Sequence, residues 1–162
     1  MLKKDRYQAF VEYFAENQPT AETELHYTNP FELLIAVILS AQCTDKRINQ
    51  ITPKLFERFP TPESLALATS DEVFTYIRSV SYPNNKAKHL IGMANILSSQ
   101  FNGIVPSATT DLQKLPGVGR KTANVVLNTA FGHPTMAVDT HIFRVGNRTG
   151  LAIGKNVLEV EH

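Results

Sequence analysis

Apolar side chains recur at helical spacing along almost the whole chain. A first amphipathic face covers residues 7–14, and Pro19 ends that segment. Residues 31–41 are apolar on nearly every side, which is typical of a helix buried at the centre of a protein. The dipeptide Asn29-Pro30 before them supplies an N-cap and a proline at the first helical position.

The remaining segments also favour helices. Residues 45–59 carry one apolar face with a kink or restart at Pro53, and a long apolar stripe over residues 87–101 ends at Asn102-Gly103. Capping residues and proline or glycine breaks predict further short helices, which begin near positions 61, 70, 111, 120, 139 and 155. Because no alternating strand pattern appears, the sequence predicts an all-α fold of about ten short helices.

Composition limits the classes of protein to consider. The 162 residues suffice for one domain or a small pair, and the net charge of +1 hides −4 in residues 1–77, +7 in residues 78–155 and −2 in the last seven. The basic segment indicates a polyanionic partner, although an unevenly charged solvated surface explains it equally well. One cysteine excludes four-cysteine metal sites and disulfides within the chain. Without a signal region or a membrane-length apolar run, we expect a reduced, intracellular protein with no membrane partner.

The most informative segment joins two predicted helices and reads Leu-Pro-Gly-Val-Gly-Arg-Lys-Thr-Ala, residues 115–123. Its two glycines permit positive φ and expose backbone N–H groups at the start of the second helix. With the helix dipole, those groups suit a phosphate. A Walker A loop does not fit because Arg120 intervenes before the lysine, and a dinucleotide fingerprint does not fit because Thr122 replaces its third glycine. Helix–hairpin–helix binding of a nucleic-acid backbone fits better.

Four segments together resemble the endonuclease III family of DNA glycosylase/AP lyases. They are Pro-Phe-Glu-Leu-Leu at 30–34, Leu-Ser-Ala-Gln-Cys-Thr-Asp at 39–45, the hairpin with its following helix at 115–132, and Val-Asp-Thr-His-Ile-Phe-Arg-Val at 138–145. The resemblance implies the helical DNA glycosylase fold and removal of oxidised pyrimidines from duplex DNA. It also implies strand cleavage at the abasic site by β-elimination through a lysine Schiff base.

By position, Lys121 matches the family's catalytic lysine and Asp139 its catalytic aspartate. An amine attacks only when it is deprotonated, and burial, the start of the helix and the neighbouring Arg120 would each disfavour the charged form of Lys121. Without the resemblance, Lys121 is interpreted as an ordinary phosphate contact. Asp139 can stabilise a cationic sugar and move protons, and it can also act as the N-cap of the helix that follows.

The resemblance also implies which residues contact DNA. Gln42 would fill the space left by the extruded base, and Tyr82 would stack on bases from a loop reading Ser-Tyr-Pro where the family usually reads Gly-Leu-Tyr. Gln42 is otherwise a polar residue at a helix end. The further predicted DNA contacts are Pro116, Gly117, Val118, Gly119, Arg120, Thr122 and Arg144.

The family's domain division places residues 20–135 in a six-helix barrel-like domain with the helix–hairpin–helix at about 111–131. Residues 1–19 and 136–162 form the remainder of a second helical domain. The family's iron–sulfur run, Cys-x6-Cys-x2-Cys-x5-Cys, is not in this sequence, so a [4Fe-4S] cofactor is implied only if a further segment exists. The last helix stops abruptly at His162, which favours a truncated chain that exposes apolar surface near Phe10 and Ile142 and is destabilised and weakly active.

Alternatives to a bifunctional repair enzyme are a non-catalytic helix–hairpin–helix DNA-binding module, an inactive truncated form and a monofunctional adenine glycosylase. The pairing of Lys121 with Asp139 argues against the binding module and the monofunctional enzyme. We expect a monomer that acts on duplex DNA with a damaged base or an abasic site, in the cytoplasm at the nucleoid.

Overall fold

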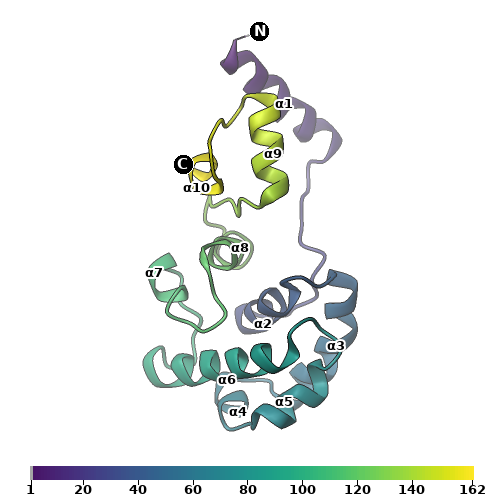
Figure 1. Cartoon of the computed structure of the whole chain (residues 1–162), viewed down its shortest axis with the longest axis vertical. Coiled ribbons are helices and arrows are strands. Elements are labelled where there is room, and N and C mark those ends of the chain that lie inside the picture. The colour runs from purple at the N-terminus through teal and green to yellow at the C-terminus, as the bar shows by residue number, and fades with distance from the viewer. Residues whose placement is uncertain (1) are drawn as a thin grey trace. The chain divides into compact units, whose positions relative to one another are not determined.

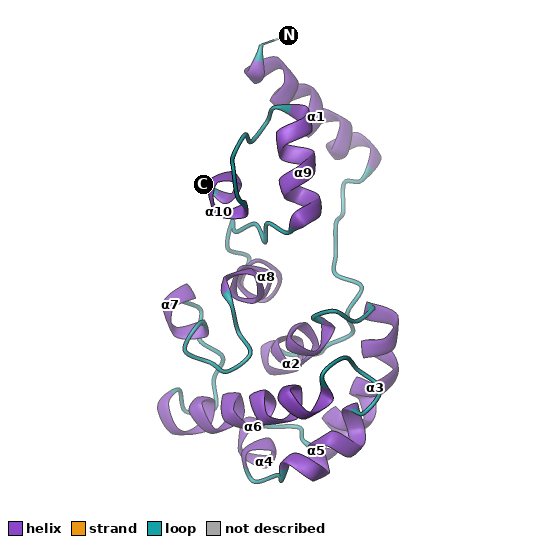
Figure 2. Cartoon of the chain, in the orientation of Figure 1, coloured by secondary structure: helices purple, strands orange, loops and turns teal. Residues whose placement is uncertain are grey.

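The computed structural model describes residues 2–162, and this part of the chain consists of helices and loops without a strand (Figure 2). The predicted all-α fold is confirmed. The chain forms two compact units, one of residues Thr23–Thr135 and one that combines Met1–Glu22 with Met136–His162. Within residues 2–162, no helix has the length and apolar character needed to cross a membrane.

The larger unit, Thr23–Thr135, surrounds one central helix (Figure 1). Its helices are α2 (Pro30–Ser40), α3 (Asp45–Arg58), α4 (Pro62–Ala66), α5 (Ser70–Ile77), α6 (Pro83–Gln100), α7 (Thr109–Leu112) and α8 (Arg120–Phe131). Eight of the eleven α2 residues are buried, and α2 packs against α3, α6 and α8. The predicted cap is confirmed, since the Asn29 side chain accepts a hydrogen bond from the Glu32 backbone N–H at 3.0 Å.

Helix α3 continues through Pro53, so the predicted restart does not occur. Pro53 lies on the exposed side of the helix, where water can reach the carbonyl that loses its partner. The opposite side is buried through Ile48, Thr52 and Leu55. Packing of that apolar face against the core stabilises α3 on both sides of the proline.

The smaller unit has three helices in the described chain, α1 (Lys3–Asn17), α9 (Thr140–Thr149) and α10 (Val157–Glu161). Neither α1 nor α9 contains a buried residue. The Arg6 guanidinium donates a hydrogen bond to the Thr149 carbonyl at 2.9 Å, which links the start of α1 to the end of α9. The predicted apolar exposure is found on both helices, at 39–45% for Phe10, Phe14, Ile142 and Val145.

Candidate functional site

The hairpin between α7 and α8 requires glycine at one of its two positions. Gly117 has φ of +81°, and a Cβ added there would lie 3.1 Å from Cβ of His89 and 3.2 Å from Cγ2 of Ile38. Gly119 has φ of −90°, so the expectation of positive φ is wrong for this residue. A Cβ at Gly119 would meet nothing within 4 Å, and its extended backbone is one that any residue can adopt.

Apolar side chains anchor the hairpin while its tip faces solvent. Leu115 and Val118 are buried in the core of the larger unit, whereas Gly119 and Arg120 are exposed. Gly119 is also the N-cap of α8 and carries no side chain to cap the helix. The local sequence therefore presents the positive end of a twelve-residue helix at the surface, next to a cationic side chain.

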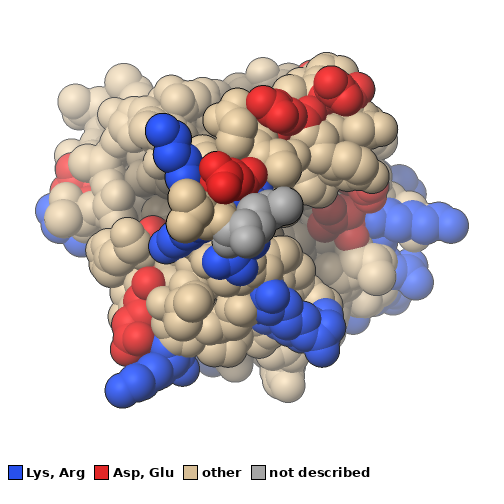
Figure 3. Space-filling view, turned by 90° about the horizontal axis from the view of Figure 1, so that it is seen from above, with Lys and Arg blue, Asp and Glu red and all other residues tan. Residues whose placement is uncertain are grey.

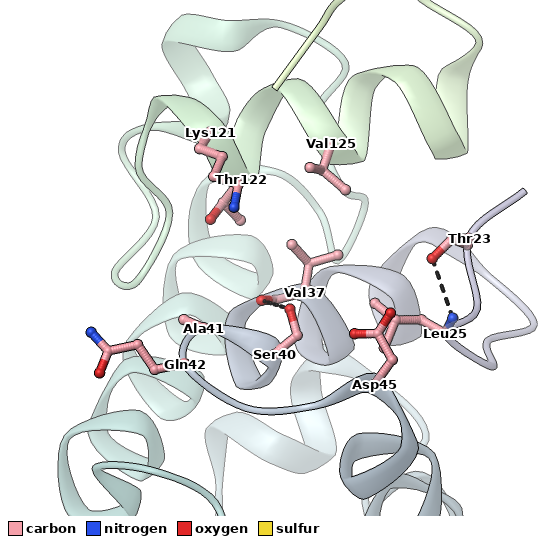
Figure 4. Close-up of a pocket in the computed structure, with 10 residues that line it drawn as sticks. All are labelled: Thr23, Leu25, Val37, Ser40, Ala41, Gln42, Asp45, Lys121, Thr122 and Val125. Atoms are coloured by element: carbon pink, nitrogen blue, oxygen red, sulfur yellow. Dashed lines mark hydrogen bonds between the residues drawn. The ribbon is translucent and has the colours of Figure 1, made fainter. Parts of the chain in front are cut away.

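A cavity of about 270 Å³ lies where the start of α8 meets the turn after α2 (Figure 4). Its polar lining includes Ser40, Gln42 and Asp45 from the end of α2 onward, Lys121 and Thr122 from α8, and Thr23 from the segment before α2. In Figure 4 the side chains of Lys121 and Thr122 extend from α8 towards the turn. The fold thus brings Gln42 together with Lys121 and Thr122, which lie far from it in the sequence.

The expected burial of Lys121 is not found, because the side chain starts from the first turn of α8 and is exposed. Sequence reasoning also missed Ser40 and Asp45, which line the same cavity. Both lie in the segment 39–45, in which Gln42 is the predicted DNA contact. A helix end followed at once by a new helix start was a sign that several of its side chains would share one site.

Gln42 occupies a backbone conformation that normally takes glycine or asparagine. The Cys43 N–H donates to the Ser40 carbonyl at 2.9 Å, Ala41 has φ of −55° and ψ of 116°, and Gln42 has φ of +56°. These are features of a type II turn with Gln42 at its left-handed position. Such a conformation costs a non-glycine residue about 1 kcal/mol. Strain of this kind concentrates at ligand contacts, and the Gln42 side chain is exposed.

Tyr82 shares this unusual backbone. It is the N-cap of α6 with φ of 52° and ψ of 50°, and its side chain is 64% exposed. Among residues 2–162 only Asn102 is a further non-glycine residue with positive φ, and asparagine tolerates that region. The hydroxyl of Ser81 donates to the carbonyl of Ala41 at 3.0 Å, so the two strained turns are directly connected.

Sequence reasoning missed Lys86, which is buried with an exposed fraction of 6%. Burial lowers the pKa of its ammonium group below the ordinary 10.5, because the charged form loses its hydration. The residue falls on the apolar stripe of α6, four positions before the buried Leu90. A lysine in phase with an apolar stripe was the signal that could have identified it.

Asp139 and Arg144 belong to the smaller unit. The Oδ1 atom of Asp139 accepts hydrogen bonds from the backbone N–H groups of His141 and Ile142, both at 2.9 Å. The N-cap role predicted for Asp139 is therefore confirmed. Arg144 is exposed on α9, and its guanidinium lies 3.3 Å from Nδ1 of His141.

Figure 3 shows basic and acidic side chains interspersed on the face that it draws. The ion pairs Arg58–Glu72 at 2.6 Å and Lys114–Asp111 at 2.7 Å are largely solvent-accessible and contribute little to stability.

Comparison with known proteins gives consistent results. The family described as HhH-GPD superfamily base excision DNA repair protein matches residues 35–162. Endonuclease III of Escherichia coli (strain K12) is 56% identical over 146 residues, which cover 90% of this chain and 69% of that protein. Endonuclease III of Haemophilus influenzae is 55% identical over the same length, with the same coverage of both chains.

Solved structures agree with the sequence comparisons. A trapped endonuclease III–DNA covalent intermediate superposes with a TM-score of 0.91 at 46% identity, covering 99% of this chain and 76% of the other. A non-covalent endonuclease III–DNA complex gives the same TM-score and coverage at 47% identity. A thermostable thymine-DNA glycosylase has a TM-score of 0.79 at 22% identity over 98% of this chain and 83% of that one, which is a likeness of fold.

Proposed function

The chain belongs to the endonuclease III family of base excision repair proteins, and from that premise we propose how its residues act. It is a DNA glycosylase/AP lyase of base excision repair. We propose that it removes oxidised pyrimidines from duplex DNA and then cleaves the strand at the abasic site. The observation that carries this proposal is the cavity in which Lys121 lies opposite the Gln42 turn.

In the proposed reaction, the neutral amine of Lys121 attacks C1′ of the damaged nucleotide. The bond from C1′ to the base breaks, and the base leaves with the bonding electrons and is protonated. The carboxylate of Asp139 stabilises the positive charge that develops on the sugar. The nitrogen of Lys121 loses a proton, the sugar ring opens as the C1′–O4′ bond breaks and O4′ takes up a proton, and a protonated Schiff base forms at C1′. A proton is then lost from C2′, and the C3′–oxygen bond breaks by β-elimination, so that the 3′ phosphate leaves with the bonding electrons. The exposed position of Lys121 beside the hairpin supports this role, because the amine can reach a bound strand.

We propose that the start of α8 binds a backbone phosphate, with Pro116, Gly117, Val118 and Gly119 shaping the hairpin and Arg120 and Thr122 beside it. The open space at Gly119 and the absence of an N-cap side chain support this contact. Gln42 and Tyr82 would enter the base stack around the extruded nucleotide, and Arg144 would contact the strand from the smaller unit. The two similar solved structures are endonuclease III–DNA complexes, which supports DNA as the ligand.

The chain's own donors do not fit a [4Fe-4S] cluster. Such a cluster takes four thiolates, and the sequence holds one cysteine, Cys43, which packs against the core of the larger unit. Within residues 2–162, no three His, Cys, Asp or Glu side chains are placed to hold a metal ion.

We further propose that residues 20–135 act as the hairpin-bearing domain and that residues 1–19 with 136–162 act as part of the second. Because Lys121 and Asp139 are both supplied by one chain, a monomer is sufficient for the reaction. A chromosomal DNA substrate would place the enzyme in the cytoplasm at the nucleoid.

Borohydride trapping on a duplex with one abasic site tests the proposal. The reductant converts a Schiff base into a stable protein–DNA adduct, which migrates separately in a denaturing gel. We expect the adduct with the parent chain and its loss in Lys121→Ala. Lys114→Ala is the matched control, since it removes an exposed lysine from the segment before the hairpin and should leave the adduct unchanged.

The outcomes separate the alternatives. Duplex binding without an adduct would contradict the lyase and favour a non-catalytic binding module. On a second duplex that carries one oxidised thymine, release of the base without an adduct would indicate a monofunctional glycosylase that activates water. An adduct that persists in Lys121→Ala would overturn the assignment of Lys121 as the nucleophile.

A further inference from the structure

Lys86 donates three hydrogen bonds from its buried ammonium group. The acceptors are the Leu39 carbonyl at 2.8 Å, the Ala41 carbonyl at 2.7 Å and the Ser81 hydroxyl at 3.0 Å. An ammonium group has three donors, so these bonds use all of them. A neutral amide or a thioether of similar length at this position would leave some of these acceptors without a partner.

The acceptors belong to the two strained turns. Leu39 and Ala41 lie at the end of α2, directly before Gln42, and Ser81 directly precedes Tyr82. Lys86 also holds Tyr82 through the main chain, because its own N–H donates to the Tyr82 carbonyl at 3.1 Å. One residue is thus bonded to both segments that carry the proposed stack-filling side chains.

Burial of the Lys86 ammonium group costs folding free energy, so stability alone does not explain this arrangement. The three acceptors are uncharged oxygens, and the electrostatic interaction with Cys43 opposes the lowering of the Lys86 pKa by burial without cancelling it. Lys86 is the fourth residue of α6, where the helix dipole disfavours a cation, although the carbonyl end of α2 favours one. Well-packed apolar residues often replace buried charges without loss of stability. A lysine at this position is therefore explained better by a role in function than by packing of the core.

We propose that Lys86 is a positioning residue, which holds Gln42 and Tyr82 in adjacent left-handed turns so that both enter damaged DNA together. This inference rests on the proposed function of those two side chains. Without the ammonium group, the turn at Gln42 can relax from its strained backbone, and insertion into DNA must then order it again. The effect falls on recognition of the damaged site and not on the amine chemistry of Lys121.

Duplexes that contain a tetrahydrofuran abasic analogue opposite 2-aminopurine test this role. The ratio of the Kd for undamaged duplex to the Kd for the analogue measures damage recognition, and the fluorescence of 2-aminopurine at saturation reports filling of the stack. In Lys86→Met we expect the ratio to fall about tenfold. We also expect a smaller fluorescence change in a chain whose circular dichroism is unchanged. A purely structural role would not alter the fluorescence of the saturated complex.

Two further variants make the result specific. Lys88→Met removes the same charge from an exposed position on α6, and we expect it to leave the ratio unchanged. In a Gln42→Ala background, Lys86→Met should have a smaller effect, because only its action through Tyr82 remains. Should Lys86→Met lose helical structure, Ser81→Ala carries the test, with an expected fall in the ratio of about threefold.

An unchanged ratio and fluorescence in folded Lys86→Met would overturn the role of Lys86, provided that the parent chain forms the borohydride adduct. Equal effects of Lys86→Met with and without Gln42 would overturn it as well. A parent chain that forms no adduct and shows no preference for the analogue would overturn both this inference and the proposed function.

Discussion

The two units of the chain bury their apolar residues to very different extents. In the larger unit, α2 is a core helix with Leu33, Leu34 and Ile35 fully buried. In the smaller unit, α1 and α9 have no buried residue, and an apolar cavity of about 240 Å³ lies among them. Hydrophobic burial is the dominant stabilising term, so the larger unit should carry most of the folding free energy.

The difference also concerns the proposed chemistry. Lys121 starts from a helix that packs on the core helix of the larger unit, whereas Asp139 caps α9, which has little burial of its own. The packing of α8 on α2 fixes the backbone position of Lys121. A carboxylate on a loosely packed helix keeps its position through local hydrogen bonds, here to two backbone N–H groups.

The largest effect is expected in the larger unit, for Leu34→Ala. Leu34 has no exposed surface, so truncation leaves a cavity and should cost about 3–5 kcal/mol of unfolding free energy. Urea denaturation followed by circular dichroism measures the loss. Leu67→Ala, at a side chain that is 88% exposed, should stay within about 0.5 kcal/mol of the parent. A similar loss in both variants would contradict the assignment of the core.

Two substitutions at Asp139 separate its cap from its carboxylate. Asparagine caps helices as well as aspartate does, so Asp139→Asn should keep the parent stability, while Asp139→Ala should lose about 1 kcal/mol. Both should lower strand cleavage at an abasic site by about 100-fold or more, because both remove the charge. Cleavage is followed on a denaturing gel. Parent activity in Asp139→Asn would show that only the cap matters.

A smaller loss is expected on the apolar face of α1. Phe10 is 39% exposed and lines the apolar cavity of the smaller unit, so Phe10→Ala should cost about 1 kcal/mol. The same urea titration measures it, with exposed Gln8→Ala on the same helix as the control. A loss as large as that of Leu34→Ala would mean that the two units share one cooperative core.

The smallest effect has the opposite sign. Gln42→Gly removes the side chain from a left-handed position and should raise the unfolding free energy by about 0.5–1 kcal/mol. Preference for an abasic duplex should fall in the same variant, since the stack-filling amide is absent. Asn102→Gly is the control, because asparagine already tolerates its positive φ. Destabilisation by Gln42→Gly would contradict the strain inferred for this turn.

Much of the fold was predictable because its signals are local. The Asn29 cap, the proline after it and the uninterrupted apolar run together identified α2 as a buried helix. The Asp139 cap was likewise readable from its place before an amphipathic segment. Such signals depend on neighbours within a few positions, so one sequence is enough to interpret them.

The site was only partly predictable. The motif segments pointed to Gln42 and Lys121, but the cavity that joins them also takes Ser40 and Asp45, and Lys121 is exposed where burial was expected. Pro53 suggested a break that the packed face of α3 prevents. These features depend on which segments contact one another in the folded chain, and helical periodicity contains no information on those tertiary contacts.

The sequence by itself determined the helices, their caps and the hairpin, because backbone hydrogen bonding and apolar spacing act over a few residues. Only the tertiary structure decided that the turns at Gln42 and Tyr82 lie together and that Lys86 bonds to both. Ala41 and Lys86 are 45 positions apart, so their contact exists only once α2 and α6 have packed. A buried ammonium group is stable only with its acceptors in place, and packing of the helices supplies them.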